Sequence, residues 1–511
     1  MDRQRSQLRA GVMLSYLNLF IGTMIPFFYT PIVLKLLGQA EYGLYSLANS
    51  IIHYLSLLSF GFGNTITRYL SKYRAEGDLE SERKTFGFFL LLYSGLSVLV
   101  LIGGFFISQN TGLFFNRGLS AKELEKLKTL TLIMTINTAV SFPHSVFYAV
   151  ITAHERFIFR QSLDIIFAIA VPVINLVALH MGFASVGMAV TTLVIQMATT
   201  FIHAFFCINC LKIRPVFVML PRKLIREICG FSLFVFLATI SDMLFWATDK
   251  VILGMLASTA AVAVYNIGGT FNSIVMSLST SISGVLVPRI TGMVVTDTPT
   301  SEWSDLVIRI GRLQFIIIGL VISGFTVFGR AFIEMWAGPD YADSFWVAVL
   351  TLFPLCIPLI QNSARSIITA QNKHQFRSIV FFCIAVCNVV STYLVVPYWG
   401  VMGAAMCTCV SYLLGQGLIM NIYYHKVTGL DIPLFWKNIL RMAIVPAVML
   451  VAGLWLLRKV AITNWLTFFV LVAAYTLIYI VLMYLFSLND YEKDILRKPL
   501  KKVYCLMCRN K

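Results

Sequence analysis

Long apolar runs, separated by short polar connections, follow one another along almost the whole chain. A helix needs about 20 mainly apolar residues to cross a lipid bilayer. Runs of that length fall at about 11–36, 44–70, 86–108, 130–152, 163–181, 183–211, 228–256, 260–287, 310–334, 345–369, 378–397, 400–424, 440–457 and 465–487. The pattern therefore predicts an all-α polytopic membrane protein with about fourteen transmembrane helices.

The composition agrees with this fold class, and the positions of the basic residues explain the positive net charge of the chain. The chain has 511 residues, of which 58% are hydrophobic and only 12% are charged, whereas soluble domains have about 25% charged residues. Most of the 40 Lys and Arg residues lie in the N-terminal segment, in the loops after even-numbered spans and in the C-terminal tail. The positive-inside rule then places both termini in the cytoplasm. The net charge of +17 is expected to meet anionic lipid head groups, not nucleic acid.

Three groups of residues recur in the same order at an offset of about 216 residues, which indicates an internal duplication. The repeated unit contains six spans, an even number, so both copies cross the membrane in the same direction. Parallel repeats of this kind are one of the two arrangements found in transporters. The matching groups are Leu37-Gly38 with Leu253-Gly254, Ile151-Thr152-Ala153 with Ile368-Thr369-Ala370, and Gly187, Ala189 and Thr192 with Gly403, Ala405 and Thr408.

The repeat divides the chain into two lobes and three smaller segments. No segment is long enough for a separate soluble domain, and the short outer loops argue against an enzyme that polymerises or transfers glycans. The predicted parts are an N-terminal six-helix lobe at 1–211, a basic inter-lobe linker at 212–227, a C-terminal six-helix lobe at 228–424, a two-helix hairpin at 425–487 and a basic cytoplasmic tail at 488–511.

Span seven is the most polar of the apolar runs, because it contains Asp242, Asp249 and Lys250. A charged side chain near the bilayer centre costs about 2.5–3.5 kcal/mol on insertion scales, so it normally faces a polar cavity or a partner. Asp249 and Lys250 have a second interpretation, in which they neutralise each other near the outer membrane surface. Asp242 lies closer to mid-membrane and predicts a hydrated path. Its repeat mate is Pro26, which can bend span one.

The segment PIVLKLLGQAEYGLYSL at 31–47, the arrangement of six, six and two spans, and the basic linker resemble polysaccharide-export flippases of the MOP superfamily. Members of this family move undecaprenyl-pyrophosphate-linked oligosaccharides from the inner to the outer leaflet. The resemblance implies a V-shaped pair of lobes around a cavity lined mainly by spans one, two, seven and eight. It also implies basic side chains in that cavity that bind pyrophosphate or acidic sugars.

The candidate site residues come from these spans and from span ten. Arginine can grip phosphate through paired hydrogen bonds, but Arg68 and Arg365 each lie near the inner end of a span. Contact with cytoplasmic lipid head groups therefore explains these two arginines equally well. For Lys35, contact with head groups at the outer membrane surface is the corresponding explanation. The substrate-binding candidates are Arg68, Arg365, Lys35, Lys250, Asn266, Asn272, Asn49 and Asn64; the coupling-ion candidates are Asp242, Asp249 and His53; and Pro26 is the candidate for helix flexing.

The resemblance thus predicts a flippase of the bacterial cytoplasmic membrane that serves cell-surface polysaccharide biosynthesis (O-antigen, capsule or exopolysaccharide) by alternating access. Its expected partners are a polyprenyl-pyrophosphate-linked glycan, membrane lipid, H⁺ or Na⁺, and other polysaccharide assembly proteins. No cofactor, metal or enzymatic activity is expected. Two alternatives share the fold: a MATE-type drug/cation antiporter, opposed by the lack of an acidic residue in span one, and a lipid II flippase, opposed by the lack of charge in span eight.

Overall fold

A computed structural model describes residues 2–494 of the chain, apart from 61, 219–235, 237–238, 285–289, 291, 295, 297 and 372. All regular elements within these residues are helices. Eleven helical stretches among them are long and apolar enough to cross a membrane. The predicted class, an all-α polytopic membrane protein, is confirmed.

The eleven stretches are compatible with about fourteen predicted spans. Predicted spans eleven and twelve form one stretch, Gln375–Lys426, which is kinked at Gly400, where φ is 53° and ψ is −133°. Predicted span two is broken into two shorter helices at Phe60, which has a left-handed φ of 49°. Predicted span seven includes residues outside the described part of the chain.

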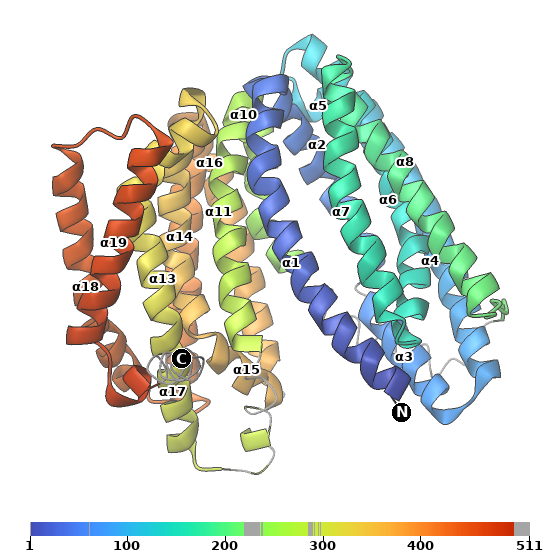
Figure 1. Ribbon diagram of the computed structural model, residues 1–511. Coiled ribbons are helices and arrows are strands. Elements are labelled where there is room, and N and C mark those ends of the chain that lie inside the picture. The colour runs from blue at the N-terminus through green and yellow to red at the C-terminus, as the bar shows by residue number, and fades with distance from the viewer. Residues whose placement is uncertain are drawn as a thin grey trace, which may run out of the picture. The chain divides into compact units, whose positions relative to one another are not determined.

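The chain separates into two compact units, and the first contains residues 1–266 and 381–404. Its longest helices, α1, α4, α6, α7 and α8, pack side by side, with α6 in contact with α2, α3, α4, α7 and α8 (Figure 1). The elements of unit 1 are α1 (Asp2–Leu37), α2 (Gln39–Ser56), η1 (Leu57–Ser59), α3 (Phe62–Glu76), α4 (Leu79–Gln109), α5 (Thr111–Phe115), α6 (Ala121–Ala153), α7 (Phe157–His180), α8 (Ala184–Phe205), η2 (Phe206–Cys210), α10 (Thr248–Leu256), the first residues of α11 (Thr259–Gly284) and the central part of α16 (His374–Tyr412).

Local sequence explains where the central helix of unit 1 begins. The Ser120 side chain accepts a hydrogen bond from the backbone of Glu123, whose carboxylate returns to Ser120 and closes a capping box. Such a box satisfies amide groups that the first turn of a helix leaves without partners. The apolar residues that follow are buried against the surrounding helices, and Leu127 and Leu130 are both fully buried.

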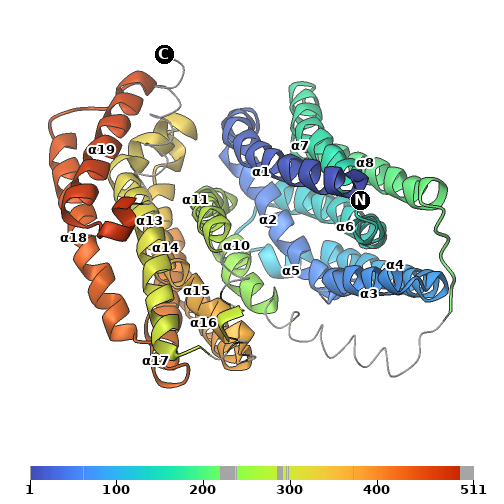
Figure 2. The same cartoon turned by 60° about the horizontal axis from the view of Figure 1, so that its bottom comes forward.

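The second unit contains residues 267–380 and 405–511. Its long helix α13 contacts α14, α18 and α19, and this grouping is visible in both views (Figure 2). The elements of unit 2 are the rest of α11, α13 (Thr300–Trp336), η3 (Pro339–Tyr341), α14 (Ser344–Ile360), α15 (Asn362–Ala370), both ends of α16 (His374–Tyr412), η4 (Leu413–Ile419), α17 (Met420–Lys426), α18 (Ile432–Leu457) and α19 (Trp465–Phe486).

The boundary between the units differs from the boundary of the sequence repeat. Residues 239–266, near the start of the second repeat, and 381–404, near its end, belong to unit 1. Unit 1 therefore contains the first repeat and part of the second. The division into two six-helix lobes remains a prediction.

Candidate functional site

The spanning helices of unit 1 expose two kinds of side chain, and only one kind is suited to lipid. On α1 the exposed residues include Phe20 and Phe28, as expected for a surface that faces hydrocarbon. On α2 the exposed residues include Asn49 and His53, one helical turn apart. Asn49 Nδ2 donates to the Tyr45 carbonyl at 3.1 Å, but exposed polar side chains are costly in hydrocarbon. We therefore interpret this face of α2 as a water-facing surface within the membrane.

A polar pocket of about 220 Å³ opens along this face of α2, between α2, α6 and α8. Two predicted site residues, Asn49 and His53, share it. The other lining residues were not predicted, because nothing in the sequence pairs α6 and α8 with this face of α2. The full lining is Tyr45, Asn49, Ile52, His53 and Ser56 from α2, Met134, Asn137, Thr138 and Ser141 from α6, and Ala189 and Thr192 from α8.

Asp249, a predicted coupling-ion residue, lies at the start of α10 and is fully buried. The Tyr265 hydroxyl of α11 donates a hydrogen bond to its Oδ2, and the Thr392 hydroxyl of α16 donates to its Oδ1 at 3.2 Å. Both donors are neutral. These hydroxyls do not neutralise the carboxylate, and the ammonium group of Lys250, the next residue, also interacts with its charge. A proton or a monovalent cation at Asp249 would therefore change a charge that Lys250 already balances in part. Neither donor was predicted from the sequence.

Lys250 and Asn266 form a chain that joins α10 and α11 to α2. Lys250 Nζ donates to Asn266 Oδ1 at 3.1 Å, and Asn266 Nδ2 donates to the Tyr42 hydroxyl at 2.9 Å. Two predicted substrate-binding residues are thus brought together by the fold, and each engages the other. Because these bonds tie the second repeat to span two, a charge in this chain also affects helix packing.

Asp242 lies in a different environment from Asp249, although both belong to predicted span seven. It is exposed on the helical residues 239–246, whereas Asp249 is buried. Between them lies Ala247, the residue before α10, whose φ of −104° and ψ of −34° stay in the right-handed helical region. Backbone hydrogen bonds from Ala247 to Met243 and from Val251 to Ala247, at 2.9 and 3.3 Å, continue the helical pattern through this position.

The remaining predicted cations are all exposed: Lys35 in the last turn of α1, Arg68 on α3 and Arg365 on α15. Both arginines lie on short helices that follow a break in a span, at Phe60 for Arg68 and at Gln361 for Arg365. Exposure is consistent with a cavity and with a head-group location, so both interpretations stay open. The Asn64 side chain lies outside the described residues.

Two predicted site residues have positions that suit a structural role, Asn272 in helix packing and Pro26 in helix bending. Asn272 is 1% exposed, and its Nδ2 donates to Thr351 Oγ1 of α14 at 2.8 Å, so its amide is engaged inside unit 2. Pro26 lies within α1, which continues through both Pro26 and Pro31 to its end at Leu37. Because proline removes a backbone hydrogen bond, the two prolines are the positions where α1 bends most easily.

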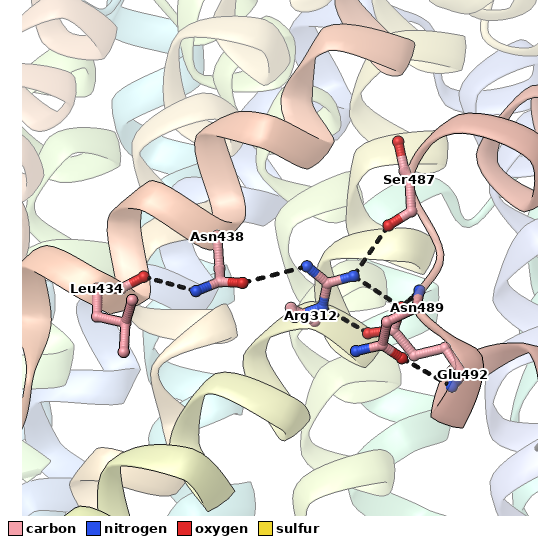
Figure 3. Close-up of polar contacts among 6 residues, drawn as sticks. All are labelled: Arg312, Leu434, Asn438, Ser487, Asn489 and Glu492. Atoms are coloured by element: carbon pink, nitrogen blue, oxygen red, sulfur yellow. Dashed lines mark hydrogen bonds and ion pairs between the residues drawn. The ribbon is translucent and has the colours of Figure 1, made fainter.

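Unit 2 contains a buried ion pair that the sequence pattern does not predict. Arg312 Nε of α13 lies 2.6 Å from Glu492 Oε1, just beyond α19, and Arg312 also donates to the Ser487 carbonyl at 2.9 Å and to Asn438 Oδ1 at 3.4 Å (Figure 3). The sequence places Arg312 among the cytoplasmic basic residues. The available signal was the Asn489-x-x-Glu492 spacing, in which each backbone amide donates to the other side chain at 2.9 Å, as in a capping box.

The long apolar helices make this chain a multi-pass membrane protein, and comparison with known proteins identifies its family. The profile of the family described as "Polysaccharide biosynthesis protein" matches residues 8–294. The chain belongs to this family, as its resemblance to polysaccharide-export flippases predicts. A curated relative, "Uncharacterized membrane protein MJ1068" of Methanocaldococcus jannaschii, is 21% identical over 420 residues, which cover 79% of this chain and 81% of that protein.

Solved structures with a similar fold come from two branches of transporters. One is "Lipid II flippase MurJ, inward closed conformation", with a TM-score of 0.72, 14% identity, and coverage of 93% of this chain and 99% of that chain. Another is an inward-facing "multidrug resistance MATE family transporter of the MOP superfamily", with a TM-score of 0.62, 14% identity, and coverage of 82% and 98%. At such identities the similarity shows the fold alone.

Proposed function

We propose that this protein is a flippase that moves polyprenyl-pyrophosphate-linked oligosaccharide units across the bacterial cytoplasmic membrane by alternating access, for cell-surface polysaccharide biosynthesis. The family match carries the proposal, because it covers residues 8–294 and connects the chain to polysaccharide biosynthesis. The family and its structural neighbours are transporters, not enzymes. The polar pocket within the spanning helices of unit 1 supports a hydrophilic cargo.

The buried carboxylate of Asp249 supports coupling of this movement to H⁺ or Na⁺. Its hydrogen bonds come from Tyr265 and Thr392, on two other helices. Protonation or cation binding at Asp249 changes the charge that these hydroxyls stabilise and thereby alters the packing of α10 against α11 and α16. In this proposal the exposed Asp242 is a second coupling candidate, and His53 in the polar pocket is a third.

The pyrophosphate requires cations, because an ion taken out of water without compensation costs several kcal/mol. Arg68, Arg365 and Lys35 are exposed, so in this proposal they bind the lipid pyrophosphate or acidic sugars, while the polyprenyl tail stays in lipid. We expect a variant with both Arg68→Ala and Arg365→Ala to lose binding of a lipid pyrophosphate. Unchanged binding would instead support contact of these arginines with membrane head groups.

Complementation of a deletion strain tests the function and separates its rivals. We expect deletion to abolish surface glycan and to accumulate lipid-linked oligosaccharide. Increased drug sensitivity with normal glycan would identify a drug/cation antiporter, and arrest of peptidoglycan synthesis would identify a lipid II flippase. Asp249→Asn is expected to lower export at least about tenfold, the effect of 1.4 kcal/mol on a rate, at unchanged membrane abundance. Asp305→Asn, at an exposed position of α13, is the matched control.

The predicted topology has its own test. Both termini are proposed to lie in the cytoplasm. A reporter enzyme that works only in the cytoplasm should therefore be active when fused after Lys511, and one that works only outside the cell should be inactive. A signal from an external reporter would contradict the orientation without affecting the fold. Co-purification with other polysaccharide assembly proteins, which we propose as partners, is measured on the same tagged chain.

A further inference from the structure

The polar pocket of unit 1 presents hydrogen-bond acceptors to whatever fills it. The hydroxyl groups of Ser56, Ser141 and Thr192 donate to carbonyls of their own helices, at 2.6, 2.7 and 2.7 Å. Each hydroxyl oxygen can still accept hydrogen bonds through its lone pairs. Thr192 also shares a side-chain hydrogen bond with Tyr45, so Ser56 and Ser141 are the hydroxyls with both lone pairs open to a ligand that brings its own donors.

The side chain of Asn137 adds another acceptor for which a ligand would have to bring a donor. Its amide oxygen is buried and accepts no hydrogen bond from any group in the described part of the chain. A buried acceptor without a partner is unfavourable, and native structures rarely keep one without a water, an ion or a ligand. Asn137 lines the pocket, but its oxygen is closed to solvent, so a rotation of the Asn137 side chain toward the pocket is what would bring this acceptor to a donor placed there.

The rest of the lining is mixed. It includes the apolar residues Ile52, Met134 and Ala189 and the polar residues Tyr45, Asn49, His53 and Thr138, but no Asp, Glu, Lys or Arg. The volume of about 220 Å³ is enough for several waters. This combination fits a small neutral ligand with several O–H donors and one C–H face. A bare cation is a poorer match, because it needs oxygen atoms on all sides.

We infer that this pocket is a subsite for one neutral, hydroxyl-rich sugar ring of the transported glycan. The inference rests on the proposed function, which names a lipid-linked glycan as cargo and leaves open where its sugar is bound. The acceptors of Asn137, Ser141 and Thr192 receive the sugar hydroxyls, and the C–H face of the ring packs on Met134 and Ile52.

Two probes that differ only in the sugar test the inference. The full chain is reconstituted in lipid nanodiscs, and its affinity is measured for farnesyl pyrophosphate and for farnesyl pyrophosphate carrying a single hexose, with glucose, galactose, N-acetylglucosamine and glucuronic acid as the panel. We expect at least one neutral hexose to tighten binding about tenfold over the sugar-free probe, as two or three additional neutral hydrogen bonds would.

The chain offers a matched pair of variants on α8. Thr192 and Thr199 are both half-buried, and each hydroxyl donates to the carbonyl four residues earlier at 2.7 Å, but only Thr192 lines the pocket. Thr192→Val and Asn137→Leu should each remove threefold or more of the sugar-dependent gain. Thr199→Val should retain it. Binding of farnesyl pyrophosphate by each variant reports that the protein is folded.

The outcomes separate the subsite from the proposed function. Binding of farnesyl pyrophosphate with no gain from any neutral hexose overturns the subsite and leaves the flippase proposal intact. A gain that persists in both pocket variants, or that Na⁺ abolishes by competition, also overturns the subsite. Failure of every probe to bind the folded wild-type protein overturns the proposed function and the subsite together.

Discussion

Two ion pairs of equal length, one in each unit, differ in what surrounds them. Lys126 Nζ lies 2.6 Å from Glu41 Oε1 in unit 1, where the side chains are 35% and 19% exposed. Arg312 Nε lies 2.6 Å from Glu492 Oε1 in unit 2, where the exposures are 7% and 2%. From the N–O distance alone, the two ion pairs would be expected to contribute equally to stability. Burial instead decides the energetics, because water replaces a lost partner at the first pair and is excluded from the second.

The two pairs also suit different mechanical tasks. Near the Glu41–Lys126 pair, Thr259 donates to Glu123 at 2.7 Å, which joins the first repeat to the start of α11 within unit 1. A partly hydrated contact of this kind breaks at low cost. The Arg312–Glu492 pair connects α13 to the segment after α19 and is nearly closed to water, so it is costly to break.

The largest expected effect comes from removing the charge of Glu492. Glu492→Gln keeps the shape but leaves Arg312 buried without its countercharge, so the free energy of unfolding should fall by about 3–5 kcal/mol. Denaturant titration of the protein in nanodiscs measures this. A double variant, Arg312→Met with Glu492→Met, should recover most of the loss. An unfolding midpoint equal to wild type in Glu492→Gln would mean that burial does not distinguish the pairs.

The next effect tests whether backbone packing holds the contacts around Thr259. A Cβ atom at Gly43 would lie 1.8 Å from the Thr259 carbonyl oxygen, whereas one at Gly22 would meet nothing within 4 Å. Gly43→Ala should destabilise the protein by about 1–3 kcal/mol through overpacking. Gly22→Ala, on α1, is the matched control and should be neutral or slightly stabilising. Equal unfolding free energies for the two variants would show that α2 does not approach Thr259 so closely.

A smaller effect is expected from the exposed pair itself. Lys126→Met should lower the free energy of unfolding by no more than about 1 kcal/mol, the usual range for partly exposed ion pairs. Salt screens such pairs, so the difference from wild type should shrink in 1 M salt. The effect of Glu492→Gln should persist in the same buffer. A loss from Lys126→Met as large as that from Glu492→Gln would reverse the comparison.

The smallest effect is a pH dependence at Glu41. Burial by itself raises the pKa of Glu41, but hydrogen bonds from Lys126 and Ser185 outweigh it and hold the pKa below its ordinary value. A lowered pKa in the folded state contributes stability above the unfolded pKa, near 4.3, and the contribution is lost as pH falls through the folded value. Unfolding midpoints between neutral pH and about pH 3 should therefore fall less steeply in Lys126→Met than in wild type. Parallel curves would contradict this.

Part of the candidate site was predictable because polar residues are costly in lipid, and their positions within an apolar run can be read from the sequence. Asn49 and His53 interrupt an apolar run one helical turn apart, and the structure places both in one pocket. Asn137 and Thr192 were missed because α6 and α8 contain many Ser, Thr and Asn residues, most of which serve helix packing. Only the packing of three helices shows which of them share the pocket.

The sequence by itself determined that this chain spans a membrane many times and belongs to its transporter family, because apolar length and local motifs are properties of neighbouring residues. It also showed that Asp249 needs compensation. Only the tertiary structure decided which groups provide it, since Tyr265 and Thr392 lie 16 and 143 positions away. Likewise, 180 positions separate Arg312 from Glu492. The physical reason is that a buried charge requires a partner within hydrogen-bond distance, and nothing in that requirement fixes the distance along the chain.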